Sequence, residues 1–143
     1  MFDWLANPNR FNRITEKIQP CILFITIITL ISGLYFGLFD SPKDYQQGDA
    51  VRIMYVHVPS AWLASFLYFS LAISCVFYLV WKHPLADLVS SSIAPIGALF
   101  SALTLVTGSL WGKPMWGTWW VWDARLTSML VLFFFYLGYI LLS

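Results

Sequence analysis

The stretch from Trp111 to Ser128, which reads WGKPMWGTWWVWDARLTS, holds the residue types best suited to a binding site. Five of the eight tryptophans of the chain lie in it, with three charged residues among them. Indole rings stack well on flat conjugated ligands, each pair adding about 1 kcal/mol beyond area burial, and basic side chains hold carboxylates. The stretch predicts a surface for a flat, apolar ligand with acidic groups, formed by Trp111, Lys113, Trp116, Trp119, Trp120, Trp122, Asp123 and Arg125.

Tryptophan also has a structural role in membrane proteins, where it anchors helix ends at the interface. An anchoring belt needs about one or two tryptophans at each helix end, whereas this stretch has five between positions 111 and 122. Trp116, Trp119 or Trp120, and Asp123 also recur at helical spacing, so a short helix lying flat would present them together. The density of tryptophan favours a binding platform over a belt.

The charged residues of the stretch have structural interpretations of their own. Asp123 precedes an apolar run and is a good helix N-cap, which is a more common role than a catalytic one. Lys113 and Arg125 can hold carboxylates, but Arg125 can equally pair with Asp123 or extend to lipid headgroups. The sequence leaves these alternatives open.

His57 is the candidate metal ligand. Pro59 suits the first turn of a helix, so His57 is predicted just outside that helix at the membrane surface. The partial positive charge of a helix N-terminus keeps imidazole neutral and able to donate its lone pair to heme iron. Position alone, however, favours an interfacial histidine that hydrogen-bonds lipid headgroups or loop carbonyls. His83 is a weaker candidate because it is predicted in a loop on the opposite face.

The composition is that of a membrane protein. The 143 residues are 59% hydrophobic and only 10% charged, whereas a soluble domain has about 25% charged residues. The net charge of +1 comes without any basic tract, so nucleic acid is not an expected partner. Cys21 and Cys75 form no CxxC or CxxCH pattern, which argues against a zinc site and covalent heme attachment.

Four uncharged apolar runs predict an all-α, polytopic membrane helical bundle in one membrane domain, residues 1–143. The predicted spans are about 21–39, 60–81, 90–110 and 126–142, and the Trp-rich loop covers 111–125. The preceding segment, Met1 to Gln19, reads either as an interfacial helix or as a solvated tail. Small residues repeat along the third run, including Ala94, Gly97, Ala98, Ser101 and Gly108, and predict close packing of neighbouring helices.

The order of the four spans places His57 and the Trp-rich loop on the same face of the membrane. Basic residues are equally numerous on the two sides, but the cluster Arg10, Arg13 and Lys17 before the first span favours a cytoplasmic N-terminus. The Trp-rich loop is then expected outside the cytoplasm. The chain stops at Ser143 without a loop or a flanking charge, which predicts a truncated chain with further spans beyond.

These segments resemble a known family. WGKPMWGTWWVWDARLTS is similar to the tryptophan-rich "WWD" signature of heme-handling membrane proteins. Within that group, DYQQGDAVRIMYVHVPSAW and APIGALFSALTLVTGS resemble the heme exporter protein C family, also called cytochrome c maturation protein C. The resemblance runs from about Asp40 to Ser128, and its motifs are long and specific.

The resemblance implies a protein of the bacterial inner membrane with six spans and both termini in the cytoplasm. Its WWD loop faces the periplasm and holds heme, expected as heme b, which is cargo. Two periplasmic histidines serve as axial iron ligands, of which His57 matches the first; the loop that carries the second would follow the fourth span. The expected partners are a periplasmic heme chaperone of cytochrome c maturation, an ATP-binding-cassette complex of the same system, and the lipid bilayer.

The residues and the resemblance together predict heme binding and delivery rather than catalysis. No Ser-His-Asp, Walker or metalloprotease pattern is present. Two alternatives come from other classes. One is a cytochrome c heme lyase subunit of the WWD type, and the other is a structural transporter subunit whose tryptophan loop only anchors the chain in the membrane.

Overall fold

The computed structural model describes residues 8–143, and within them the regular structure is helical. The four long helices are apolar enough to cross a bilayer, which confirms the predicted all-α membrane fold with four candidate spans. In chain order the elements are α1 (Pro8–Tyr35), the π-helix η1 (Phe36–Asp40), α2 (Val51–Trp81), α3 (Pro84–Trp116) and α4 (Ala124–Leu142).

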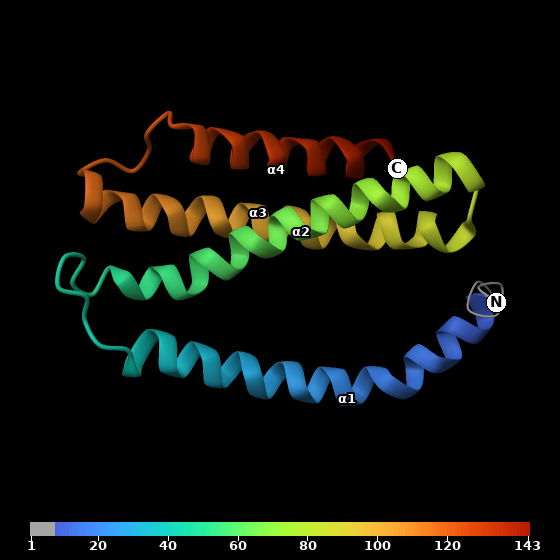
Figure 1. Cartoon of the computed structure of the whole chain (residues 1–143), viewed down its shortest axis with the longest axis horizontal. Helices are drawn as coiled ribbons and strands as arrows, with labels where there is room; N and C mark the ends of the chain where they lie inside the picture. The colour runs from blue at the N-terminus through green and yellow to red at the C-terminus, as the bar shows by residue number, and fades with distance from the viewer. Residues whose placement is uncertain (1–7) are drawn as a thin grey trace. The chain divides into compact units, whose positions relative to one another are not determined.

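The chain divides into two compact units, and the first consists of the residues up to Asp40. Its described part is α1 followed directly by η1. Figure 1 shows a bend toward the N-terminal end of α1, and the helix contains Pro20, which lacks the N–H that an unbroken helix requires. The predicted interfacial helix lies partly outside the described residues. From Pro8 onward it is the beginning of α1, continuous with the predicted first span.

The second unit, Ser41–Ser143, is a bundle of three helices in which α3 packs against both α2 and α4. Figure 1 shows α2 crossing α3, with α4 along the other side of α3. The sequence explains this arrangement because one face of α3 carries small residues, and these let neighbouring helix backbones approach closely. The buried residues of α3 are Ser90, Ala94, Gly97, Ala98, Ser101, Thr104, Thr107, Gly108 and Gly112.

Tyr136 of α4 packs against both α2 and α3 near the middle of the bundle. Its side chain is fully buried, and its hydroxyl donates a hydrogen bond of 2.7 Å to the carbonyl oxygen of Ala64 in α2. The ring of Tyr136 occupies the space next to Gly97 of α3 that a larger residue would fill. One side chain of α4 therefore contacts both of the other helices and fixes their separation.

Two helix boundaries differ from the sequence prediction. Because α2 begins at Val51, His57 lies inside the helix rather than just before it, and Pro59 is an interior residue. Neighbouring helices and hydroxyl side chains make proline tolerable inside membrane helices, and α2 continues through Pro59 to Trp81. The second difference is that α3 continues to Trp116 and ends at Gly117, whose φ of 76° terminates the helix.

Candidate functional site

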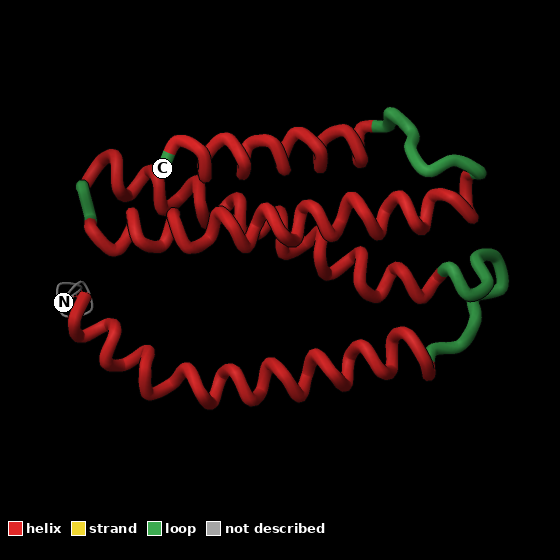
Figure 2. Tube along the Cα trace, turned by 180° about the vertical axis from the view of Figure 1, so that it is seen from behind, coloured by secondary structure: helices red, strands yellow, loops and turns green. Residues whose placement is uncertain are grey.

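A cavity of about 390 Å³ opens at the end of the second unit where the loops before α2 and after α3 lie. In Figure 2 both loops are drawn in green at this end, and the short turn between α2 and α3 that contains His83 is at the other. The cavity falls within the roughly 300–1,000 Å³ of small-molecule sites. It is lined by Met54, His57, Val58, Ala61, Thr104, Leu105, Gly108, Trp111, Trp116, Asp123, Arg125, Leu126 and Met129.

His57 enters the cavity from α2 and is held against α3. Its Nδ1 lies 3.0 Å from the hydroxyl oxygen of Thr107. A Cβ atom added at Gly108 would lie 3.1 Å from Cε1 of His57, so the absence of a side chain at this position lets the imidazole rest on the helix backbone. The ring is half-buried, and one of its edges faces α3.

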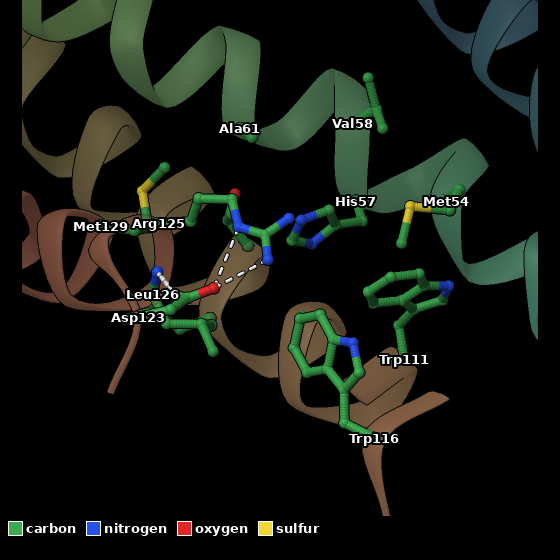
Figure 3. Close-up of a pocket in the computed structure, with 13 residues that line it drawn as sticks. Met54, His57, Val58, Ala61, Trp111, Trp116, Asp123, Arg125, Leu126 and Met129 are labelled. Atoms are coloured by element: carbon green, nitrogen blue, oxygen red, sulfur yellow. Dashed lines mark hydrogen bonds and ion pairs between the residues drawn. The ribbon is translucent and has the colours of Figure 1, made fainter. Parts of the chain in front are cut away.

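Trp111 and Trp116 form an aromatic corner of the cavity at the C-terminal end of α3 (Figure 3). Their ring centroids are 5.1 Å apart and their planes are nearly perpendicular, at 84°. The indole N–H of Trp111 donates a hydrogen bond of 3.0 Å to Oε1 of Gln47, in the loop before α2. This bond connects the first loop to the wall of the cavity and restrains the plane of the Trp111 ring.

The loop that provides Gln47 is held in a compact turn. Oδ1 of Asp44 accepts hydrogen bonds from the backbone N–H groups of Gln46 and Gln47, at 2.9 and 2.8 Å. Asp49 pairs with Lys43 at 2.8 Å, and the hydrogen bond from that lysine holds the pKa of the Asp49 carboxyl below its usual value. These local bonds place the Gln47 side chain within reach of Trp111.

Asp123 and Arg125 form the polar side of the cavity (Figure 3). Asp123 is the N-cap of α4, as predicted, and its Oδ1 accepts a 2.9 Å hydrogen bond from the backbone N–H of Leu126. That bond, with the neighbouring Arg125, keeps the pKa of the Asp123 carboxyl below its usual value. Arg125 donates through Nε and Nη2 to the same Asp123 oxygen, at 3.0 and 2.8 Å, and its guanidinium lies 5.4 Å from the centroid of Trp116.

The other four residues predicted for the site do not line this cavity. Lys113 donates to the carbonyl oxygen of Gly117 at 3.0 Å, which satisfies the end of α3. Trp119 lies under the amino group of Lys113, and Trp120 packs edge-on against the exposed Trp122. The predicted flat helix with one continuous platform is wrong, because Gly117 ends α3 and the segment before Asp123 is not helical.

Several lining residues were missed by reading the sequence for chemically reactive groups. Met54 and Ala61 share the helical face of His57 on α2, and Thr104 and Gly108 share that of Trp111 on α3. The spacing of three, four and seven positions was a usable signal for both faces. The predicted spans 60–81 and 90–110 leave His57 and Trp111 outside the helices, so the sequence prediction does not place them on one helix face with these residues.

The arrangement combines one imidazole, two indole rings and one guanidinium in a cavity whose remaining walls are mainly apolar. Imidazole donates a lone pair to transition metals, indole rings favour flat conjugated systems, and guanidinium favours carboxylates. A metal carried in a flat organic ligand with acidic groups matches all three. Within residues 8–143, no cluster of three or more His, Cys, Asp or Glu side chains could hold a bare metal ion.

Comparison with known proteins identifies the family to which this sequence is similar. The model of the family described as heme exporter protein C matches residues 1–143. The chain is 54% identical over 134 residues to heme exporter protein C of Bradyrhizobium diazoefficiens, covering 94% of this chain and 51% of that protein. For the Haemophilus influenzae protein of the same name the identity is 53% over 141 residues, covering 96% of this chain and 57% of the relative.

The protein named heme exporter protein C from Escherichia coli K12 is 49% identical over 138 residues, covering 96% of this chain and 56% of the relative. The chain therefore spans about half the length of the relatives that it matches. The cavity residues, from Met54 to Met129, lie within the range matched by the family model.

Proposed function

The chain belongs to the heme exporter protein C family, and from this premise we propose that it binds heme as cargo during cytochrome c maturation. The observation that carries the proposal is the convergence of His57, Trp111, Trp116 and Arg125 on one cavity. In this function His57 provides a lone pair to the iron, and the two indole rings contact the porphyrin. Arg125 provides positive charge near the propionates.

The guanidinium of Arg125 is suited to this role by its geometry. Its two hydrogen bonds to Asp123 use Nε and Nη2, which leaves the Nη1 side for an acidic group. In the view of Figure 3 the guanidinium extends from α4 over the cavity between Asp123 and His57. The contact with the Trp116 ring helps to hold it in this position.

The wider role is proposed on the basis of the family. The bound heme, as heme b, is passed to a periplasmic heme chaperone, and an ATP-binding-cassette complex of the same system takes part in the process. The protein crosses the bacterial inner membrane several times, with the cavity on the periplasmic side. Trp119, Trp120 and Trp122 lie in the loop that would face the chaperone, and Lys113 lies next to them in the last turn of α3. There these four residues can contact the exposed edge of the heme.

The test of heme binding is the absorption spectrum of the purified protein and of paired tryptophan variants. We expect a Soret band in the parent protein. The combined replacements Trp111→Leu and Trp116→Leu should lower the heme affinity roughly 5- to 140-fold, and the heme-to-protein ratio with it. Two ring contacts together contribute about 1–3 kcal/mol, and about 1.4 kcal/mol corresponds to tenfold in affinity.

The matched control replaces Trp119 and Trp122 by leucine, because these two tryptophans lie in the same region but do not line the cavity. We expect this control to retain most of the heme. Equal losses of heme in the two double variants, in proportion to lost protein, would indicate that the tryptophans only anchor the chain. A parent protein without a Soret band after reconstitution with hemin would contradict heme binding.

The proposed orientation is tested by cysteine labelling from outside the cell. In a background with Cys21 and Cys75 replaced by alanine, Tyr45→Cys should react with a membrane-impermeant thiol reagent in intact spheroplasts. Lys82→Cys, at the opposite end of α2, should react only after permeabilisation. Tyr45 is 92% exposed, so a cysteine there is accessible to the reagent. Lys82 has a left-handed backbone although it is not glycine, so replacing it by cysteine adds little backbone strain. The reverse labelling pattern would place the cavity in the cytoplasm.

A further inference from the structure

We infer that Thr107 is a positioning residue that holds His57 as the Nδ1–H tautomer and so reserves the lone pair of Nε2 for the heme iron. The inference rests on the proposed function and extends it to a residue of α3 outside the Trp-rich stretch. Neutral histidine carries its proton on only one ring nitrogen. A hydrogen bond that determines which nitrogen is protonated therefore also determines which one can bind a metal.

The hydroxyl of Thr107 donates its hydrogen to a backbone carbonyl of its own helix. Its oxygen lies 2.7 Å from the carbonyl oxygen of Leu103, close to the usual O–H···O distance of about 2.7–2.8 Å. A hydroxyl has a single hydrogen to donate. Toward His57, the Thr107 oxygen consequently acts as an acceptor, and the hydrogen between them belongs to Nδ1.

The distance between the two side chains agrees with this assignment. Nδ1 of His57 and Oγ1 of Thr107 are 3.0 Å apart, which is typical of an N–H donor and an oxygen acceptor, at about 2.9–3.0 Å. The Thr107 oxygen also lies 3.3 Å from the carbonyl oxygen of Thr104, which is a second acceptor for the Thr107 hydroxyl within α3.

Burial limits the partners that can form a hydrogen bond with Nδ1 of His57. Thr107 is only 8% exposed, so little water is available to replace its hydroxyl as a partner for Nδ1. The backbone of Gly108 supports the Cε1 edge of the same ring. Histidine ligands of metals usually donate their second ring N–H to a neighbouring acceptor, and losing that partner typically costs roughly 10–100-fold in metal affinity.

The tautomer can be measured without heme. The chain has two histidines, so a His83→Asn background leaves His57 as the only signal in the ¹⁵N spectrum of ¹⁵N-histidine-labelled protein. We expect a protonated Nδ1 and an unprotonated Nε2 in that background. Thr107→Val, which has nearly the same shape without the hydroxyl, should shift the population toward the Nε2–H form, and Thr107→Ser should restore the original spectrum. A parent spectrum dominated by Nε2–H, or no change in Thr107→Val, would overturn the inference.

The second measurement uses hemin as the probe. Thr107→Val should weaken hemin binding roughly 10–100-fold and change the iron spectrum, whereas Thr107→Ser should stay near the parent. Identical hemin binding and identical iron spectra in Thr107→Val and the parent would contradict the positioning role. If the parent protein bound no hemin, heme binding itself would fail, and the ¹⁵N spectrum would still decide the tautomer of His57.

Discussion

Replacing Gly97 by alanine is expected to destabilise the bundle of α2, α3 and α4 by about 3 kcal/mol, at the upper end for overpacking a tight core. The new methyl group would overlap the ring of Tyr136. That ring cannot easily move away, because it is fully buried and its hydroxyl is bonded to the Ala64 carbonyl. The midpoint of thermal unfolding in detergent should fall markedly, together with the yield of monodisperse protein.

Gly138→Ala is the matched control, since it makes the same change in α4 where the added methyl group meets no atom within 4 Å. Alanine is favoured over glycine in a helix by about 0.5–1 kcal/mol, so this variant should be at least as stable as the parent. Adding Tyr136→Leu should reduce the cost of Gly97→Ala by removing the ring that clashes. Equal stability of Gly97→Ala and Gly138→Ala would contradict the close packing of α3 against Tyr136.

His57→Ala is expected to have the largest effect on the iron. The substitution removes the imidazole that contacts α3 and faces the cavity. Hemin affinity should fall by at least tenfold, since even losing a partner of a metal-bound histidine typically costs roughly 10–100-fold. Residual binding should remain, because Trp111, Trp116 and Arg125 are unchanged. The measurement is the absorption spectrum of the purified protein during titration with hemin.

Adding free imidazole to His57→Ala tests whether the missing iron ligand is an imidazole. Free imidazole can occupy the space left by the side chain, so it should restore a spectrum closer to that of the parent. His83→Ala is the control, because His83 lies at the opposite end of α2 and should not affect the iron. A His57→Ala protein that retained heme with the spectrum of the parent would show that His57 is not a ligand.

The membrane fold was predictable because its signals are local in the sequence. Uncharged runs long enough to cross the bilayer define helices without knowledge of their neighbours. The N-cap role of Asp123 follows in the same way from its place immediately before an apolar run. The small residues of α3 indicated that this helix would be closely packed, and it is the most buried of the four.

The helix ends were less predictable, because proline and glycine have different effects in different surroundings. Pro59 was expected in the first turn of a helix, yet it lies inside α2, and α3 likewise continues through Pro114. The position of Gly117 is what ends α3, through its left-handed backbone. This ending divides the tryptophans, so that Trp111 and Trp116 line the cavity while Trp119 and Trp122 do not.

By itself, the sequence determined the four apolar helices and the family-specific stretch rich in tryptophan, because composition and motifs are properties of consecutive residues. The order of the four spans also placed His57 and the Trp-rich stretch on the same face of the membrane. Only the tertiary structure decided which side chains share the cavity. The contact of His57 with Thr107 joins residues 50 positions apart, and that of Trp111 with Gln47 joins residues 64 apart. Such pairs depend on how α2 crosses α3, and that crossing is set by packing around small residues rather than by any local signal.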